Sequence, residues 1–241
     1  MAARPTKLRF ILRMSLQRLV GPSKDVVQTS QDAGNPSGFI SCATMITIYG
    51  DPISGNCLKV KWTAERLGVP FIWKNVDILK GESRTPAFLE MNSAGQVPTV
   101  VFADGRALAQ SNAIILHLAE GSVLIPPDPY ERAKMLEWLF WEQYSHEPAV
   151  AVARFQMKYL GKPREALDPR LLERGEAALR RLDTQLAGRR YLVGEALSLA
   201  DIALVAYTRM AGDGGFRLSD YPAVRAWVSR LEAELPIEDP R

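Results

Sequence analysis

The feature that most constrains the fold is a change of pattern part-way along the chain. Between Met45 and Leu118, short runs of β-branched and aromatic residues alternate with segments whose apolar residues recur at helical spacing. From about residue 130 onward the apolar spacing is helical throughout. With 241 residues, of which 47% are hydrophobic, the chain can bury two modest cores. The pattern therefore predicts a mixed α/β domain followed by an all-helical domain.

The α/β part is predicted to open with a strand, a helix and a second strand. Residues 45–50 form the first strand, the next helix ends at Gly68, and the second strand starts at Phe71. Two parallel strands joined along the chain need a crossover helix between them. This order therefore predicts a parallel pair of strands with a helix packed on it.

A short helix, a hairpin and another helix are predicted to follow. Thr85-Pro86 is typical of a helix N-cap with proline at the first helical position. Asp104-Gly105 is a strong hairpin signal between two short apolar runs, and a third helix is predicted to start near Ser111. The order βαβ, α, ββα is that of a thioredoxin-like domain, a small mixed sheet with helices packed on it.

Composition places the domain boundaries. The thioredoxin-like domain is predicted over residues 45–120, and residues 121–129, with three prolines in a short polar stretch, are predicted to form a linker. The all-helical domain then covers residues 130–241. Four helices are predicted there, at residues 130–160, 168–187, 198–211 and 221–234.

The third of these four helices has an explicit start signal. Ser198 and Asp201 stand three positions apart, as in a capping box, and Leu197 and Ile202 occupy the positions of a hydrophobic staple. We interpret this motif as a helix cap that fixes the fold rather than as catalytic machinery.

Residues 1–44 differ in composition from the rest. They carry six basic and two acidic residues, a net +4, whereas the whole chain has a net charge of +3. The remainder is too balanced for a nucleic-acid surface. We interpret residues 1–44 as a flexible basic leader, with an Arg-rich mitochondrial targeting peptide as the alternative. In either case the folded protein is expected to begin at Met45.

Cysteine usage and hydropathy indicate the compartment. Cys42 and Cys57 are the two cysteines of the chain, so a disulfide framework is not expected and a reducing, cytoplasmic location is favoured. No apolar run approaches the ~20 residues that a membrane span needs. No pair of histidines and acidic residues has the spacing of a metal site, so no metal is predicted.

Three short motifs carry the candidate chemistry. The first strand delivers the hydroxyl of Ser54 to a helix start, Val97-Pro98 forms a turn beside an extended edge, and Ser111 opens a second helix. A cis peptide bond costs little only before proline, so Val97-Pro98 is predicted to be cis. The free N–H groups at a helix start favour binding of an anion. Together these parts are suited to gripping a small extended peptide and activating its thiol.

The chain resembles the glutathione S-transferase family from Met45 to about residue 234. A tyrosine that ends the first strand and a serine five residues later, Tyr49 and Ser54, match the serine-type members. The stretches 77–82 and 92–98 resemble theta-like and bacterial members. The resemblance implies a thioredoxin-like domain that binds glutathione and a helical domain that supplies most of the second-substrate pocket.

Glutathione is the implied co-substrate, and its thiol has to be activated. A thiol with a pKa near ~8.5 is a few per cent thiolate at neutral pH, and lowering that pKa by two units takes about 2.7 kcal/mol. We expect Ser54 to supply a hydrogen bond to the thiolate at the positive end of a helix dipole, with Asn56 as a second donor. A plain N-cap role for Ser54 is the alternative. Tyr49 is expected to be a packing residue.

The resemblance also implies which residues bind the rest of glutathione. The backbone of Val97 pairs with its cysteinyl part, the second helix start takes the γ-glutamyl carboxylate, and basic side chains take the glycyl carboxylate. The expected set is Lys80, Arg84, Gln96, Val97, Pro98, Gln110 and Ser111. Gln110 and Gln96 stand where glutamate and lysine are common in the family, which predicts only moderate affinity for glutathione.

The second-substrate pocket is expected on the first long helix of the helical domain. Helical spacing groups Phe140, Tyr144, His146 and Arg154 there. Cys57 suggests a competing hypothesis, a disulfide-exchange enzyme with Cys57 as its reactive thiol. Its position on an apolar helical stripe favours a buried core cysteine instead.

We therefore expect a glutathione transferase that acts on a small hydrophobic electrophile, or that uses glutathione to reduce a peroxide or disulfide. The alternative is a non-catalytic module that uses the same fold to bind a partner protein. The resemblance further implies a homodimer, with contacts expected from the third helix and from the first long helix of the helical domain. Ile115, Met135 and Trp138 are the expected apolar contributors.

Overall fold

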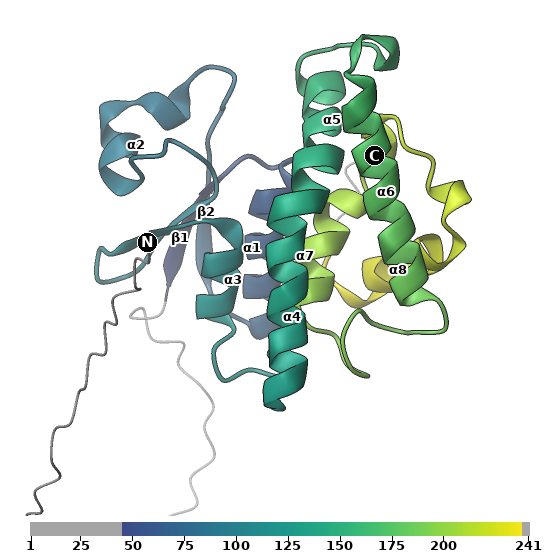
Figure 1. Cartoon of the computed structure of the whole chain (residues 1–241). Helices are drawn as coiled ribbons and strands as arrows, with labels where there is room; N and C mark the ends of the chain where they lie inside the picture. The colour runs from purple at the N-terminus through teal and green to yellow at the C-terminus, as the bar shows by residue number, and fades with distance from the viewer. Residues whose placement is uncertain (1–44, 238–241) are drawn as a thin grey trace, which may run out of the picture. The chain divides into compact units, whose positions relative to one another are not determined.

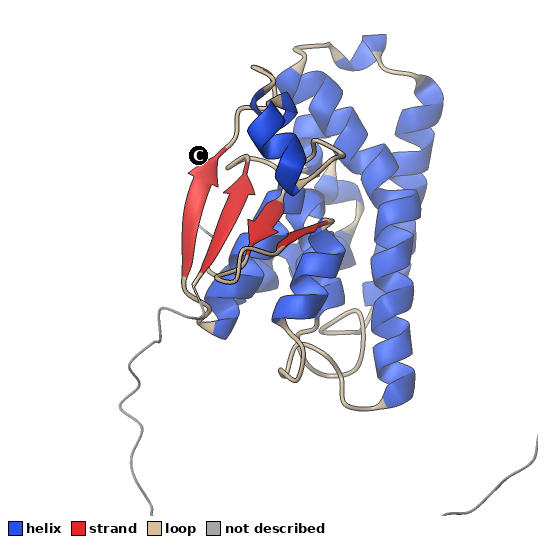
Figure 2. Cartoon of the chain, turned by 90° about the vertical axis from the view of Figure 1, so that its left-hand side faces the viewer, coloured by secondary structure: helices blue, strands red, loops and turns tan. Residues whose placement is uncertain are grey.

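The computed structural model describes residues 45–237, and a four-stranded sheet forms its N-terminal part. Along the sheet the order is β2, β1, β3, β4, with β1 and β2 parallel and the other two pairs antiparallel. The strands are β1 (Ile46–Gly50), β2 (Phe71–Asn75), β3 (Thr99–Val101) and β4 (Ala107–Ala109). Figure 2 shows them as one layer. The predicted leader, residues 1–44, lies outside the described residues.

Three α-helices belong to this sheet, and their ends follow the local sequence. They are α1 (Gly55–Leu67), α2 (Pro86–Met91) and α3 (Ser111–Leu118), with a 3₁₀ turn η2 (Glu82–Arg84) before α2. Gly68 ends α1 in the left-handed conformation, at φ 67°, which glycine adopts without a steric penalty. Thr85 caps α2 by accepting a hydrogen bond from the Phe88 N–H. The predicted thioredoxin-like and all-helical fold class is confirmed.

The second part of the chain contains helices alone among the described residues. A continuous helical segment consists of α4 (Pro129–Trp141), η3 (Glu142–Ala151), α5 (Val152–Arg154) and η4 (Phe155–Tyr159). The later helices are α6 (Pro169–Leu186), α7 (Leu199–Thr208) and α8 (Pro222–Glu234), with 3₁₀ turns at η5 (Arg164–Ala166), η6 (Ala211–Gly214) and η7 (Leu218–Asp220). None of the helices in residues 45–237 combines the length and the apolar character that crossing a membrane requires.

Most of the second half of the first long helical segment has π-helical geometry. Both η3 and η4 are π-helical, and Pro148 lies inside η3. Proline lacks an N–H group and its ring crowds the carbonyl one turn earlier, so an ordinary α-helical turn is disfavoured there. The wider turns change which side chains share a face. Glu142 of this segment contacts the sheet domain through Lys59 and Asn112.

Helix α1 lies between the sheet and the helical part (Figure 1). It packs against α3 within its own domain and against α7 of the helical domain. Buried side chains of both parts belong to one hydrophobic cluster, which includes Val60 and Ile114 from the sheet domain and Leu204 from α7. The N-terminus of α1 is therefore held at the junction of the two parts.

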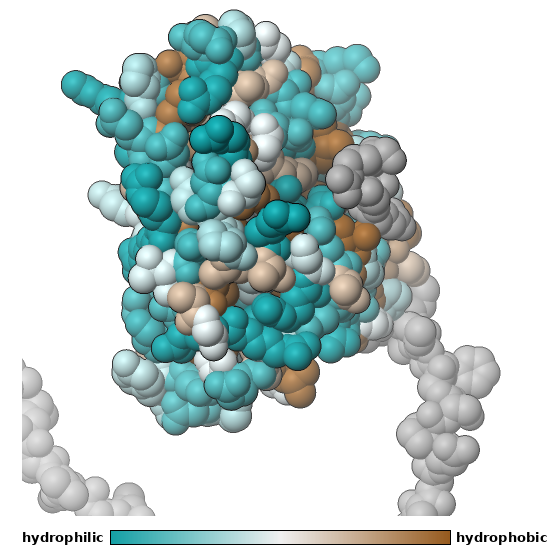
Figure 3. Space-filling view, turned by 90° about the vertical axis from the view of Figure 1, so that its right-hand side faces the viewer, coloured by the Kyte–Doolittle hydropathy of each residue, from teal (hydrophilic) through white to brown (hydrophobic). Residues whose placement is uncertain are grey.

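Helix α6 illustrates the polar outer surface of the helical domain. Its buried residues recur at helical spacing, as Leu171, Ala178, Leu182 and Leu186 do, and the opposite face is charged. The face seen in Figure 3 is accordingly mostly hydrophilic, with scattered hydrophobic side chains.

Burial within the chain bears on two expectations, the linker at residues 121–129 and the dimer contacts. Leu124 and Ile125, inside the predicted linker, are buried in the core, and the Leu199 N–H donates to the Leu124 carbonyl. The proposed dimer contributors Ile115, Met135 and Trp138 are also buried within the single chain, at 0%, 0% and 3% exposure. These three side chains lie on helix faces that point into the interior of the single chain. They therefore offer no surface to a second copy.

The Ser198 and Asp201 motif has the predicted capping-box geometry and a wider role. The buried Asp201 carboxylate accepts hydrogen bonds from the Ser198 backbone N–H and hydroxyl. It also accepts from the Leu192 backbone N–H and from the Trp227 indole N–H. One side chain thus joins the start of α7 to the preceding loop and to α8.

We predict that Asp201→Ala lowers the free energy of unfolding by at least about 3 kcal/mol, because several buried donors lose an ionic acceptor at once. Urea denaturation measures the loss. Asp220→Ala is the matched control, since Asp220 forms an exposed ion pair with Arg217 and its removal is expected to cost less than about 1 kcal/mol. Equal costs for the two substitutions would contradict the anchoring role.

Candidate functional site

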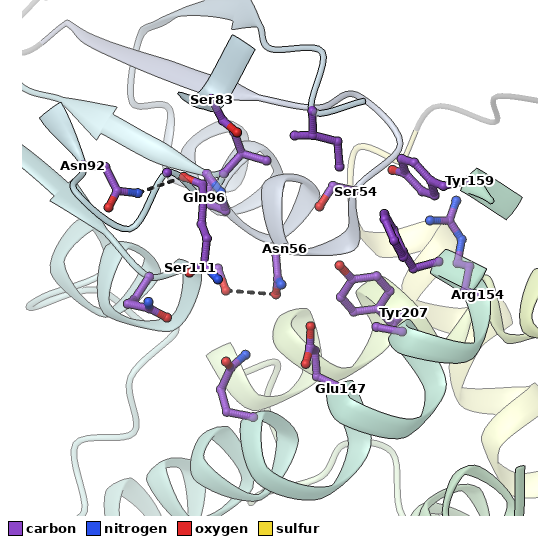
Figure 4. Close-up of a pocket in the computed structure, with 18 of the residues that line it drawn as sticks. Ser54, Asn56, Ser83, Asn92, Gln96, Ser111, Glu147, Arg154, Tyr159 and Tyr207 are labelled. Carbon is purple, nitrogen blue, oxygen red and sulfur yellow. Dashed lines mark hydrogen bonds between the residues drawn. The ribbon is translucent and has the colours of Figure 1, made fainter. Parts of the chain in front are cut away.

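A cavity of about 670 Å³ opens where the N-terminus of α1 meets the helical domain. Its walls come from the α1 start, the turn before β3, the α3 start, the η3 to η4 segment and α7 (Figure 4). The polar and proline-turn residues of its lining include Ser54, Asn56, Arg84, Gln96, Val97, Pro98, Gln110, Ser111, Gln143, Glu147, Arg154, Tyr159 and Tyr207. A volume of this size suits a small molecule.

Ser54 occupies the N-cap position of α1 with an extended backbone, at φ −78° and ψ 122°. An N-cap serine ordinarily accepts a hydrogen bond from an N–H group of the first helical turn. The Ser54 side chain makes no such capping bond, and the first turn of α1 contains no acidic residue. The hydroxyl therefore lies on the cavity wall at the positive end of the helix dipole, where a negative charge is favoured.

Asn56 has a fixed orientation in the cavity. Its Oδ1 accepts hydrogen bonds from the Lys59 ammonium at 2.8 Å and from the Ser111 hydroxyl at 3.1 Å. With its oxygen held by two donors, the amide has to present its NH2 group elsewhere. Figure 4 shows the dashed contact to Ser111 and the Asn56 side chain between the two walls of the cavity. Asn56 therefore offers donors only on its cavity side, where it also hydrogen-bonds to the Glu147 carboxylate.

The orientation of Asn56 depends on a buried ion pair. Lys59 of α1 and Glu142 of η3 are 2.8 Å apart, and both side chains are 0% exposed. The second Glu142 oxygen accepts from the amide groups of Asn112 and Gln143. A buried pair is tolerated only when further hydrogen bonds satisfy both ions, as they do here. The pair joins the sheet domain to the helical domain directly beneath the cavity.

We predict that Lys59→Met lowers the free energy of unfolding by about 3–5 kcal/mol, because it leaves the Glu142 carboxylate buried without its cation. Chemical denaturation monitored by tryptophan fluorescence tests this. The matched control is Lys134→Met, which removes one partner of a surface pair with Glu137 and is expected to cost less than about 1 kcal/mol. A small loss for both variants would show that the buried pair is not a structural requirement.

The turn before β3 forms a second wall. Val97-Pro98 is a cis peptide, as predicted. The Asn92 amide and the Thr99 hydroxyl both donate to the Gln96 carbonyl, at 2.8 and 3.2 Å, so the turn is fixed from inside. This arrangement leaves the backbone of Val97 at the cavity, just before β3 begins.

The start of α3 forms the third wall. Gln110 has φ 70° and ψ 110°, and it is the one non-glycine residue with positive φ among residues 45–237. Strained backbone of this kind persists where the surrounding structure imposes it, and it is concentrated at ligand sites. Ser111 follows as the first residue of the helix, and its hydroxyl points to Asn56.

Comparison with known proteins identifies the family. The glutathione S-transferase N-terminal domain matches residues 53–120, and the glutathione S-transferase C-terminal domain matches residues 136–234. The chain belongs to the glutathione S-transferase family. Its relatives of known structure include a glutathione S-transferase from Pseudomonas fluorescens, which is 47% identical over 78% of this chain and 94% of that one, with a TM-score of 0.75.

Two further structures agree with this assignment. A glutathione S-transferase from Xanthobacter autotrophicus is 44% identical over 80% of this chain and 95% of that one, with a TM-score of 0.76. A delta-class glutathione transferase from Nilaparvata lugens is 31% identical over 79% of this chain and 90% of that one, with a TM-score of 0.72. The similarity therefore covers both domains of the transferase fold.

The structure brings most of the predicted glutathione-binding residues to one cavity. Its lining includes Ser54, Asn56, Arg84, Gln96, Val97, Pro98, Gln110 and Ser111. Lys80 does not line the cavity, because its side chain is 78% exposed and pairs with Asp77. Arg84 does line it, and its guanidinium donates to the Ala94 carbonyl. A carboxylate at this end would therefore meet Arg84 rather than Lys80.

Of the four residues expected in the second-substrate pocket, Arg154 alone lines this cavity. Phe140 and Tyr144 are exposed, at 73% and 87%, and lie outside it. His146 is fully buried, and its Nε2 contacts the Thr208 hydroxyl. Burial lowers the pKa of His146 to about 4, so its imidazole is neutral at physiological pH. For Tyr144 and His146 the π-helical turns explain the difference, because they shift the faces that regular helical spacing predicts.

Sequence reasoning missed several lining residues, among them Glu147 and Tyr207. Glu147 lies on η3, where the wider turns obscure the periodicity, and Tyr207 stands in the almost wholly apolar α7. Burial raises the pKa of Glu147, and the negative charge of Glu142 acts in the same direction. A tyrosine in an apolar helix is usually a core residue, so the sequence pattern gave no indication that Tyr207 lines the cavity.

The competing hypothesis for Cys57 is not supported by its surroundings. The side chain is 0% exposed, and burial raises the pKa of its thiol to about 12. A nucleophilic cysteine needs an exposed thiolate. Cys57 is a core residue of α1, as its apolar stripe predicts.

Proposed function

We propose that the protein is a glutathione transferase in which Ser54 and Asn56 stabilise the glutathione thiolate. The observation that carries the proposal is the Ser54 hydroxyl at the N-terminus of α1, which makes no helix-capping bond and lies beside an Asn56 amide whose oxygen is held by Lys59 and Ser111. The Ser54 hydroxyl and the Asn56 amide are therefore two hydrogen-bond donors on the same part of the cavity wall. Family membership supports glutathione conjugation in general.

The remaining walls suit the rest of glutathione. The Val97 backbone is placed to pair with the cysteinyl part as an added strand would, and the α3 start offers N–H groups to the γ-glutamyl carboxylate. Arg84 and Gln96 lie at the end that would take the glycyl carboxylate. The three contacts hold an extended tripeptide with its sulfur over α1.

The reaction follows from thiolate formation. The thiol proton leaves to solvent, the sulfur lone pair forms a bond to the electrophilic carbon, and a leaving group departs with its bonding electrons. Peroxide reduction is the second activity we propose for the site, in which two glutathione molecules and a peroxide give glutathione disulfide, an alcohol and water. In both reactions the protein contributes donors that favour the thiolate.

The helical wall of the cavity favours a polar second substrate over the purely hydrophobic one expected from sequence. Gln143, Glu147 and Arg154 face the cavity beside Phe155. The Arg154 side chain is 4% exposed, and its Nε donates to Asp213 at 3.2 Å. An electrophile with both an aromatic and a polar part is the best match to these groups.

We predict that Ser54→Ala lowers kcat by about 10²–10³-fold, because one donor to the developing or bound thiolate is lost. Glutathione affinity is expected to remain, since the contacts to the rest of the peptide are intact. Steady-state conjugation kinetics and calorimetric titration measure the two quantities. Ser219→Ala, at an exposed serine outside the cavity, is the matched control.

Turnover of Ser54→Ala within about twofold of the wild type would contradict the role of Ser54. Asn56→Ala is the next variant, and it is expected to show the same pattern of lost turnover with retained binding.

The alternative function is a non-catalytic module that binds a partner protein through the same fold. Retention on immobilised glutathione without any conjugation or peroxide turnover would favour it. A cytoplasmic homodimer is part of the proposal, with the contact surface to be found outside the buried Ile115, Met135 and Trp138. Sedimentation at micromolar concentration tests the dimer.

A further inference from the structure

The ring of Tyr207 packs directly on the backbone where α1 begins. A Cβ atom placed on Gly55 would lie 2.8 Å from two carbons of this ring, so position 55 accommodates only glycine while the ring stays in place. Gly55 lies between Ser54 and Asn56, the two proposed thiolate donors. The ring of Tyr207, from the helical domain, therefore packs against the first residue of α1 in the sheet domain.

The phenol of Tyr207 points into the cavity. Tyr207 lines the cavity although its overall exposure is 7%, and Figure 4 shows its hydroxyl directed towards Ser54 and Asn56. Burial raises the pKa of this phenol, while the Ser54 hydroxyl and the Asn56 backbone N–H beside it act in the opposite direction. The phenol therefore stays protonated at physiological pH and keeps a hydrogen to donate.

We propose that Tyr207 is a third catalytic donor, whose phenol O–H hydrogen-bonds to the glutathione thiolate from the helical domain. The inference rests on the proposed function, because it concerns the same thiol position. Charge-assisted hydrogen bonds to an anion are the strong ones, and this one lies in a partly dehydrated site. Thiolate formation thereby depends on contact between the two domains.

The charged groups around the phenol come from two elements. Glu147 of η3 lies on the adjoining cavity wall, and its carboxylate opposes a second negative charge there. The Lys59 ammonium of α1 is 5.9 Å from the centre of the Tyr207 ring and is held by Glu142. The Cys57 thiol, also from α1, is kept protonated by burial. The Glu147 charge disfavours a thiolate nearby, and a hydrogen bond from Tyr207 to the sulfur offsets this effect.

A second tyrosine in the cavity is occupied elsewhere. The Tyr159 hydroxyl donates to the Asp51 carboxylate at 2.8 Å, and Tyr159 comes from η4 at the far end of the helical wall. Tyr49, five residues before Ser54, lies outside the cavity, and its hydroxyl accepts from the Lys74 ammonium. Tyr207 is thus the tyrosine of the described cavity whose hydroxyl adjoins both proposed donors.

The test is the pKa of bound glutathione, followed by the ultraviolet absorbance of its thiolate as pH is varied. Tyr207→Phe keeps the ring on Gly55 and removes only the hydroxyl, so the variant is expected to fold, which thermal melting checks. We expect the bound-thiol pKa to rise by about one unit, and kcat/KM below that pKa to fall about tenfold. Above the raised pKa, kcat/KM should converge on the wild-type value. A purely structural role would lower it at every pH.

Tyr49→Phe is the matched control and is expected to leave the bound-thiol pKa unchanged. Gly55→Ala is a second variant, which displaces the ring without altering the phenol and should raise the same pKa. An unchanged thiol pKa in Tyr207→Phe, with Ser54→Ala still impaired, would overturn this inference and leave the proposed function intact. A wild-type protein that does not lower the pKa of bound glutathione at all would overturn both.

Discussion

The ion pair between Lys59 and Glu142 is the interaction on which the rest of the site depends. It joins α1 to η3, it is wholly buried, and its ammonium also holds the Asn56 oxygen. Uncompensated charges of this kind are costly in a protein interior, so the two domains have to meet in one register to satisfy both ions. The same register brings the cavity walls together.

This constraint explains why the candidate site lies between the domains. The start of α1 alone offers a hydroxyl and a helix dipole to a thiol. Contact with the helical domain adds dehydration, the Tyr207 phenol and the fixed amide of Asn56. A hydrogen bond to an anion gains strength as water is excluded. Packing of α7 against α1 and the proposed thiol activation therefore depend on one interface.

Local sequence signals predicted the elements that local chemistry decides. The Gly68 helix end, the Thr85 cap, the hairpin at Asp104-Gly105 and the cis bond before Pro98 follow from backbone preferences of one or two residues. The Ser54, Val97 and Ser111 motifs likewise meet in one cavity. Each follows or precedes a strand at the same end of the sheet, where β1 and β4 finish and β3 begins. The family resemblance connected these motifs to glutathione.

The remaining features depend on distant contacts that spacing does not reveal. A lysine on a helix is normally exposed, and only the position of Glu142 makes burial of Lys59 favourable. The exposed Tyr144 and the buried His146 differ from expectation because π-helical turns around Pro148 shift the helix faces. The site position of Tyr207 depends on a glycine in the other domain.

The most direct test of the account is a crystal structure of the protein with glutathione bound. The sulfur is expected within hydrogen-bond distance of the Ser54 hydroxyl and the Asn56 amide, with the cysteinyl backbone paired to Val97 and the γ-glutamyl carboxylate at Ser111. Glutathione bound elsewhere, or with its sulfur directed away from the start of α1, would contradict it.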